Sequence, residues 1–330
     1  MIENTLDISI IIVNYKTPEL IIRCVESIES YVQGVSYEVI VVNNVAKGDD
    51  KGAILSRFPN VKWLETGYNA GFGRANNVGM RAAIGKTILL LNSDTYLIDE
   101  SVQTCFKQLV SDTNVAAAGA YQLFPDLTPR PFYHTFTFQR SFWIVPTSLQ
   151  FILEKLIPQN KYTDIQQVDY IAAAFLMVKK EVVESVGGFD EEFFLYGEDV
   201  EWSCRLAQKG KLLVYKNCQI VHEEWGSKPE RFEMADQRSY VNRFDPQIQL
   251  SNLVWIRKYY GVTYFVSLMA HYWFIAVIFY VFKICINGLK GKPLGSNLEN
   301  QKQFLSTEHL FTSKYNRILW LKPTFYKIEN

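Results

Sequence analysis

The stretch Thr87-Ile-Leu-Leu-Leu-Asn-Ser-Asp-Thr95 decides the fold. Its residues 88–91 form a short, unbroken apolar run, which is typical of a strand buried on both faces of a parallel sheet. Asn92, Ser93 and Asp94 follow at the carboxyl end, where open α/β sheets bind their ligands. A carboxylate there can hold Mg²⁺ or Mn²⁺ against phosphate oxygens, because these ions prefer oxygen ligands. The three residues are also ordinary turn formers, so the tripeptide alone leaves a plain strand-to-turn junction open.

The composition indicates a folded protein without a nucleic-acid partner. With 330 residues and 48% hydrophobic content, the chain can bury the core of one large domain or two smaller ones. Its 34 Lys and Arg balance 34 Asp and Glu, and no basic block attracts nucleic acid. The five cysteines are scattered and form no CxxC pair, which favours reduced thiols in a cytosolic protein. The acidic N-terminus lacks the basic region of a signal peptide.

Strand and helix patterns alternate four times up to this stretch. We expect strands at 8–13, 37–42, 61–65 and 88–91, with helices at 18–31, 51–58 and 72–83 between them. Thr17 is expected to cap the first helix and Pro18 to occupy its first position. Such alternation predicts an α/β fold with right-handed crossovers and a mostly parallel central sheet flanked by helices.

The downstream half continues less regularly. We expect a helix at 99–110, a strand at 115–120, a strand-like segment at 168–178 and a helix at 180–186 that stops at Gly187-Gly188. Residues 124–164 are rich in Pro, Phe and Trp and are expected to form a variable insertion. The glycines of 67–73 do not have the spacing of a dinucleotide-binding loop; Gly71 and Gly73 either let the backbone approach a ligand or start the helix.

The ordered motifs resemble those of family 2 glycosyltransferases, particularly the rhamnosyltransferase-like branch. The resemblance covers about residues 8–227 and is carried by the following motifs: Val13-Asn14-Tyr15, Val41-Val42-Asn43-Asn44, Asn69 to Gly79, Asn92-Ser93-Asp94, Gly187 to Trp202, His222 and Gly226-Ser227. It implies a glycosyltransferase A fold, a nucleoside-diphosphate sugar donor, a divalent metal (Mn²⁺ or Mg²⁺) and inversion at the anomeric carbon.

The resemblance also implies roles for single residues. Asn14 and Tyr15 would line the nucleoside pocket, and Asn43 would face the base. Asp94 and His222 would hold the metal, and Asp199 would be the general base with Glu198 beside it. We expect the donor also to contact these residues: Asn69, Gly71, Asn76, Asn92 and Ser93.

Two positions depart from the family pattern. Asn43 stands where the family usually has Asp, and an amide accepts a hydrogen bond from a pyrimidine N3–H only through its oxygen. Base preference is therefore an open question. Ala173 replaces a small Gly before the acceptor-side strand, which narrows that surface.

The chemistry of sugar transfer needs these residue types. A metal at Asp94 would neutralise the charge that develops on the leaving phosphate. A carboxylate near the acceptor, for which we choose Asp199, would take the proton of the attacking hydroxyl. By themselves, Glu198 and Asp199 also suit a helix N-terminus, and His222 a structural histidine. Lys228 and Arg231 could meet phosphate or lie in a solvated loop.

The C-terminal region raises the question of a membrane. The segment 262–282 carries no permanent charge and is long enough to span a bilayer. Cations flank both of its ends, however, and Tyr and Trp are spread along it instead of lying only at its ends. This pattern favours an in-plane anchor on an anionic leaflet over a span, with a buried helix or a dimer interface as the soluble alternative. We therefore divide the chain into a catalytic domain, 1–245, and a helical, membrane-associating region, 246–330.

We expect a glycosyltransferase at the cytoplasmic face of the plasma membrane, peripheral or single-span. It would transfer a sugar, rhamnose being favoured, from a dTDP- or UDP-sugar to a polyprenyl-linked saccharide of a surface glycan. A sugar nucleotidyltransferase is disfavoured, because residues 14–18 are not a Gly-rich phosphate loop. The remaining alternative is a catalytically silent, membrane-bound subunit of a glycan assembly complex, which could be oligomeric.

Overall fold

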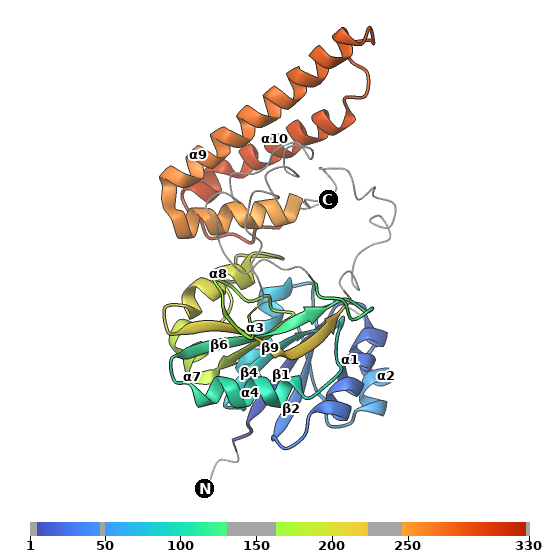
Figure 1. Ribbon diagram of the computed structural model, residues 1–330, viewed down its shortest axis with the longest axis vertical. Helices are drawn as coiled ribbons and strands as arrows, with labels where there is room; N and C mark the ends of the chain where they lie inside the picture. The colour runs from blue at the N-terminus through green and yellow to red at the C-terminus, as the bar shows by residue number, and fades with distance from the viewer. Residues whose placement is uncertain (1–4, 47–49, 131–162, 224–245, 328–330) are drawn as a thin grey trace. The chain divides into compact units, whose positions relative to one another are not determined.

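The computed structural model describes residues 5–46, 50–130, 163–223 and 246–327, and these fall into two compact units. The described residues up to 223 form the first unit, and those from 246 onward form the second (Figure 1). Each unit has its own architecture.

The first unit is built on a nine-stranded sheet with the order β3-β2-β1-β4-β8-β6-β9-β5, in which β7 also pairs with β9. The strands are β1 (Ile8–Asn14), β2 (Tyr37–Asn43), β3 (Lys62–Glu65), β4 (Thr87–Asn92), β5 (Thr95–Leu97), β6 (Val115–Leu123), β7 (Ile165–Gln167), β8 (Phe175–Lys179) and β9 (Lys211–His222). The neighbours β3, β2, β1 and β4 are parallel, as the alternating pattern predicts.

Helices cover both faces of this sheet (Figure 1). They are α1 (Pro18–Tyr31), α2 (Asp50–Arg57), α3 (Phe72–Ala82), α4 (Ser101–Ser111), α7 (Lys180–Val186) and α8 (Glu198–Leu206). Ile10 and Ile12 of β1 pack in one apolar cluster with α1, α2 and α4, whereas Ile11 packs in the other with α3, α7 and α8. Successive side chains of a strand point to opposite faces, so an unbroken apolar run is what a sheet covered on both sides requires.

The expected elements differ from the observed ones mainly after Asn92. The short strand β5 was not expected, and pairs antiparallel with β9. The strand-like segment 168–178 forms a strand only from Phe175, because Ala172 to Ala174 turn and bring the Phe175 N–H to the Ala172 carbonyl. β8 runs antiparallel to both β4 and β6, so the complete sheet is mixed.

The second unit is a helical hairpin. α9 (Pro246–Leu289) is broken at Gly261, whose φ of 86° is in the left-handed region that favours glycine. α10 (Glu299–Leu319) packs beside α9 (Figure 1). The region 246–330 is helical as expected, but apolar periodicity does not mark the bounds of α10, because its buried positions include polar residues such as Gln301 and Glu308.

Candidate active site

Asp94 and His222 meet at the carboxyl edge of the sheet. Asp94 lies in the turn between β4 and β5, and His222 is the last residue of β9. The β5–β9 ladder pairs Thr95 with His222, and the Glu223 N–H donates to the Asp94 carbonyl at 3.0 Å. This backbone pairing places Oδ1 of Asp94 3.2 Å from Nε2 of His222. Both side chains are largely buried, so their interaction is poorly screened by water.

Gln122 of β6 fixes the orientation of the His222 ring. Its Oε1 lies 3.0 Å from Nδ1, and an amide oxygen can only accept, so Nδ1 carries the proton. In the neutral ring Nε2 then presents its lone pair to Asp94. Two lone-pair atoms at this distance repel each other unless a proton or a cation lies between them. Arg130, buried at the same edge, donates to the His222 carbonyl at 2.6 Å.

The residues at this edge fit a divalent cation. A carboxylate oxygen and an imidazole nitrogen are both usual ligands of Mn²⁺-class ions. In the described part of the chain no group of three or more His, Cys, Asp or Glu side chains is placed to hold a metal ion. A site with two protein ligands suits an ion that takes its other ligands from phosphates and water, as Mg²⁺ usually does.

A second polar cluster lies at the ends of β1 and β2. The Asn14 side chain is fully buried, and its Nδ2 donates to Asn43 Oδ1 at 3.0 Å and to Asp50 Oδ2 at 2.9 Å. The parallel register pairs Asn14 with Asn43, which explains their proximity. Asp50, the first residue of α2, therefore places a carboxylate beside Asn43, the position where the family pattern has an Asp.

This cluster is connected to the edge of the sheet where Asp94 and His222 meet. Asn14 Oδ1 accepts from the Thr17 N–H at 3.2 Å, and the Thr17 hydroxyl lies 3.4 Å from that of Ser93. The Thr17 side chain does not cap α1 as expected, while Pro18 does occupy the first helical turn. Tyr15 lies between Asn14 and Thr17 in the sequence and is partly exposed. The Lys16 ammonium lies 5.6 Å from the centre of the Tyr15 ring.

Asn69 and Gly71 shape the loop before α3. Asn44 Nδ2 donates to the Gly71 carbonyl at 3.1 Å, and Asn69 Oδ1 accepts from the Gly71 N–H at 3.1 Å. Gly71 has a φ of 80°, and a Cβ there would lie 2.1 Å from the Phe194 carbonyl oxygen. This glycine therefore permits close packing of two backbones. Its role in donor binding stays a prediction.

Asn76 is buried and Asn92 is partly buried, and the two differ in their hydrogen bonds. Asn76 Nδ2 donates to the Phe72 carbonyl one turn earlier in α3. Asn92 Oδ1 is buried and has no hydrogen-bond partner among the described residues. A buried unpaired oxygen two residues from Asp94 is consistent with a ligand-binding edge. Contacts of either side chain with a donor stay predictions.

Glu198 and Asp199 begin α8, after two left-handed residues, Tyr196 and Gly197. Burial raises the pKa of Asp199 to about 6, although the amides of Val200 and Ala173 favour its ionised form. Burial and the neighbouring charge of Asp199 raise the pKa of Glu198 to about 8. At neutral pH, Asp199 is therefore mostly ionised and Glu198 mostly protonated, which is the pattern of one base and one neutral neighbour.

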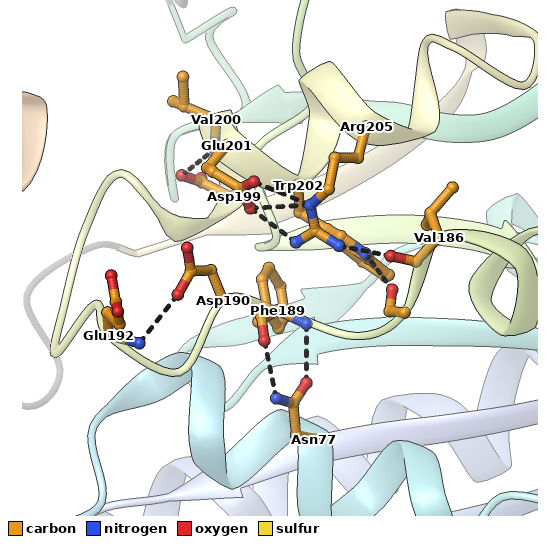
Figure 2. A network of polar contacts seen from close by, with 11 residues as sticks. Asn77, Val186, Phe189, Asp190, Glu192, Asp199, Val200, Glu201, Trp202 and Arg205 are labelled. Atoms are coloured by element: carbon orange, nitrogen blue, oxygen red, sulfur yellow. Dashed lines mark hydrogen bonds and ion pairs between the residues drawn. The ribbon is translucent and has the colours of Figure 1, made fainter. Parts of the chain in front are cut away.

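The rest of α8 is tied to the surrounding loops (Figure 2). Trp202 is fully buried, as expected for a core aromatic, and its Nε1 donates to the Gly187 carbonyl at 2.9 Å. Arg205 pairs with Glu201 and donates to the Val186 carbonyl, so this cation is engaged away from Asp199. Asn77 of α3 exchanges two hydrogen bonds with the backbone of Phe189. These contacts tie α8 to the segment 186–187 and tie Phe189 to α3.

The turn at Ala173-Ala174 connects Asp199 with the edge of the sheet where Asp94 and His222 meet. The Ala174 carbonyl accepts from the Asn92 N–H at 3.2 Å, and the Ala173 amide lies against the Asp199 carboxylate. The same turn thus contacts the Asp199 carboxylate and the backbone of Asn92, two residues before Asp94. Most of the expected residues form three clusters in the first unit: the Asp94–His222 edge, the Asn14 cluster and the start of α8. The expected residues Asn69, Gly71 and Asn76 lie apart from these clusters, around the start of α3.

Sequence reasoning missed Gln122 and Asp50. Gln122 was detectable as the one polar side chain near the end of the apolar run 115–123, although its partner could not be known without the β6–β9 pairing. Asp50 lies in the acidic pair at 49–50, whose link to Asn14 depends on tertiary structure. Gly226, Ser227, Lys228 and Arg231 lie outside the described residues, as does most of the expected insertion, 131–162.

Comparison with known families supports the resemblance. The model of the family described as "Glycosyl transferase family 2" matches residues 9–187, more than half of the chain. The fold is also that of a solved structure, the mannosyltransferase PcManGT of Pyrobaculum calidifontis in complex with GDP-Man and Mn²⁺. That similarity has a TM-score of 0.54 at 16% identity and covers 97% of this chain and 89% of the other. The expected fold class is confirmed.

Three curated relatives are similar over 56% to 72% of this chain. The low-salt glycan biosynthesis hexosyltransferase Agl10 of Haloferax volcanii is 26% identical, over 72% of this chain and 74% of its own length. The N-acetylglucosaminyl-diphospho-decaprenol L-rhamnosyltransferase of Mycobacterium tuberculosis is 24% identical, over 56% and 66%. The O-antigen biosynthesis protein RfbC of Myxococcus xanthus is 26% identical over 69% of this chain, which spans only 18% of that relative.

Proposed function

Because this chain belongs to glycosyl transferase family 2, we propose that it is an inverting, metal-dependent enzyme that transfers L-rhamnose from a dTDP-sugar to a polyprenyl-linked saccharide. The choice of sugar and acceptor is supported by the similarity to the mycobacterial protein named as a decaprenol-linked L-rhamnosyltransferase. Catalysis is assigned to the region 1–245 and membrane association, at the cytoplasmic face, to 246–330.

The observation that carries the proposal is the Asp94–His222 pair at the carboxyl edge of the sheet, 3.2 Å apart. A divalent cation held there by Asp94 and His222 would act as a Lewis acid on the diphosphate leaving group. Gln122 keeps Nε2 of His222 available for this role by accepting from Nδ1–H. Ser93, which precedes Asp94, is linked to Asn14 through Thr17 and so joins the proposed metal site to the proposed nucleoside site.

Asn14, Asn43 and Asp50 would recognise the nucleoside. The Asn43 and Asp50 oxygens already converge on Asn14 Nδ2, and each retains lone pairs that can accept from a pyrimidine N3–H. A carboxylate is the stronger acceptor of the two. Asp50 therefore supplies, from α2, the charge that Asn43 lacks.

The reaction itself is a single displacement. The acceptor hydroxyl oxygen forms a bond to the anomeric carbon while the bond from that carbon to the phosphate oxygen breaks on the opposite face, which inverts the configuration. Asp199 takes the hydroxyl proton, and the nucleoside diphosphate leaves with the bonding electron pair. A pKa of about 6 keeps Asp199 ionised at neutral pH and still basic enough to assist.

Glu198 has a supporting role in this proposal. Its carboxyl is buried, and Oε2 has no hydrogen-bond partner among the described residues. With a pKa of about 8, Glu198 is protonated at neutral pH and adds no second charge beside Asp199. A second negative charge beside Asp199 would raise the pKa of Asp199 further, so a larger fraction of this base would be protonated at neutral pH.

The test separates chemistry from binding. We expect Asp199→Asn to lower the transfer rate by about 10²–10⁴-fold, the usual contribution of a general base. The rise in melting temperature given by dTDP and Mn²⁺ should be retained, because ligand binding to the folded state stabilises it whether or not chemistry follows. Glu184→Gln, which neutralises an exposed carboxylate on α7, is the matched control. Full turnover by Asp199→Asn would remove Asp199 from the role of base.

A further inference from the structure

The helices of the second unit form an antiparallel pair. Starting after Gly261, successive contacts join α9 to α10 in opposite directions. The ring centres of Phe265 and Tyr315 are 5.4 Å apart, Trp273 Nε1 donates to the Thr312 hydroxyl at 2.8 Å, and the ring centres of Phe279 and Phe304 are 6.5 Å apart. The second half of α9 therefore runs along most of the length of α10 (Figure 1).

The opposite side of α9 is an exposed apolar stripe. Its side chains recur at helical spacing, which places them on one face. They are Val262, Val266, Ala270, Phe274, Val277, Ile278, Val281, Phe282 and Cys285. Phe274 and Phe282 are 62% and 61% exposed, which is unusual for two phenylalanines of one helix. By length and composition, α9 is also the one helix of the described residues that could cross a membrane.

The outer side of α10 is polar. Its exposed side chains, at the same helical spacing, include Lys302, Gln303, Ser306, His309, Ser313, Asn316 and Arg317. The apolar residues of this helix, among them Phe304, Phe311 and Ile318, are buried. The hairpin thus has one apolar side, formed by α9, and one polar side, formed by α10.

The hairpin is also strongly basic, although the whole chain is neutral. Residues 257–322 contain nine Lys and Arg but only two acidic residues, Glu299 and Glu308. Most of the cations lie near the ends of the helices, at 257–258, 290–292 and 314–322. Such a distribution is complementary to the negative surface of an anionic leaflet.

A membrane-spanning α9 is incompatible with this pairing. Because α10 packs along the second half of α9, a span would carry Lys302, Glu308 and Lys314 into the hydrocarbon core with it. Charged side chains are unfavourable at that depth. A hairpin lying in the plane of the interface leaves α10 in water while the apolar stripe of α9 enters the lipid.

We propose that the exposed face of α9 between Val262 and Cys285 docks on an anionic bilayer as an in-plane element, with α10 on the aqueous side. This inference concerns the second unit alone and does not depend on the sugar transfer proposed above. Flotation with vesicles requires no donor or acceptor, so a failure here leaves the enzymatic proposal untouched.

The first experiment is flotation of the full chain with phosphatidylcholine vesicles, with and without phosphatidylglycerol. The double variant Phe274→Glu/Phe282→Glu should bind anionic vesicles about tenfold more weakly or worse, because two exposed apolar side chains no longer enter the lipid. The matched control Gln303→Glu/Asn316→Glu adds the same charge to the polar face and should bind much more strongly than the α9 variant. Circular dichroism confirms that both variants fold.

The second experiment measures depth along the helix. With Cys204 replaced by Ser, Cys285 is the one exposed thiol of the chain, because Cys24, Cys105 and Cys218 are buried. An environment-sensitive fluorophore is attached either there or at Phe274→Cys in a Cys285→Ser background. An in-plane helix gives a blue shift and equal quenching by shallow nitroxide lipids at both sites. A spanning helix separates the two depths by about 16 Å, at 1.5 Å rise per residue.

Three results would overturn the proposal. Equal vesicle binding by the α9 variant and the parent would show that the stripe does not enter lipid. A steep difference in depth between positions 274 and 285 would indicate a span. A label that stays in an aqueous environment after vesicles are added would show that its position does not enter lipid, and a label that is already in an apolar environment before vesicles are added would show that the stripe is covered by protein.

Discussion

Oδ1 of Asp94 lies 3.2 Å from Nε2 of His222, at the junction of two strands that are far apart in the sequence. The distance is set by backbone pairing, since Thr95 and His222 are partners in the β5–β9 ladder. In the proposed metal site, two ligand atoms held by a ladder are preorganised, so little conformational entropy would be lost when an ion binds.

We therefore expect Asp94→Asn and His222→Ala each to abolish the Mn²⁺-dependent part of the thermal stabilisation by a nucleoside diphosphate. Each change removes one of two protein ligands, and the metal could then be held only weakly. Differential scanning fluorimetry with dTDP, with and without Mn²⁺, measures the effect. Glu184→Gln serves as control, and an unchanged Mn²⁺ response in both variants would place the metal elsewhere.

Gln122 is expected to act through His222. Gln122→Leu removes the acceptor for Nδ1–H, so the ring can rotate or change tautomer, and Mn²⁺ affinity should fall by about 10–100-fold. Gln122→Glu keeps an acceptor at the same place and should restore most of that affinity. Electron paramagnetic resonance of free Mn²⁺ in a titration reports binding without turnover. Equal affinity in the Leu and Glu variants would reduce Gln122 to a structural residue.

The pH dependence of transfer should report Asp199. Its pKa, raised by burial to about 6, predicts that kcat/KM rises about tenfold per pH unit below 6 and levels off above it. Glu198→Gln, which imitates the protonated form present at neutral pH, should leave this profile nearly unchanged around pH 7. A profile that is flat from about pH 5 to pH 7 would contradict the assignment of the base.

The parts of the fold that follow local periodicity were predictable. Strands β1, β2 and β4 are largely buried on both faces, so their apolar runs carry the information directly, and Pro18 marks the start of α1. The strand β5 was not predictable, because three residues after a turn have no periodicity to detect. Yet this strand brings His222 to Asp94.

The site was predictable only as a set of residues. The ordered motifs pointed to Asp94, Asp199 and His222, but not to what orients them. Gln122 and Asp50 act through side-chain hydrogen bonds between elements remote in sequence, to His222 and Asn14 respectively. Similarly, the region 246–330 was expected to be helical but the bounds of α10 were not predicted, because its buried face contains Glu308, which apolar periodicity would place on the exposed side.

The Asn14 cluster predicts a compensating pair of substitutions. Asn43→Asp would place a second carboxylate beside Asp50, both within 3.0 Å of the same Asn14 nitrogen. Repulsion should destabilise the first unit by about 1–2 kcal/mol, and Asp50→Asn in the same chain should restore stability. Denaturant unfolding of the two single variants and the double variant completes the cycle. Additive effects would mean that the two side chains do not share a site.

Glu308 predicts a pH-dependent weakness of the hairpin. Its side chain is buried, neither carboxyl oxygen has a hydrogen-bond partner among the described residues, and burial raises its pKa to about 8. The folded protein thus binds this proton more tightly than the unfolded chain, whose Glu has a pKa near 4.5. The stability that depends on the protonated carboxyl is complete below about pH 4.5 and is lost as the pH rises through about 8.

Glu308→Gln should remove this dependence, because an amide stays neutral. We expect the variant to be more stable than the parent by about 1–3 kcal/mol at pH 9, and by much less at pH 5. Urea unfolding at the two pH values, followed by circular dichroism, measures the difference, and Gln303→Glu on the outer face of α10 shows what an exposed carboxylate does. A Glu308→Gln variant with no gain at high pH would mean that the Glu308 carboxylate is stabilised in the folded hairpin.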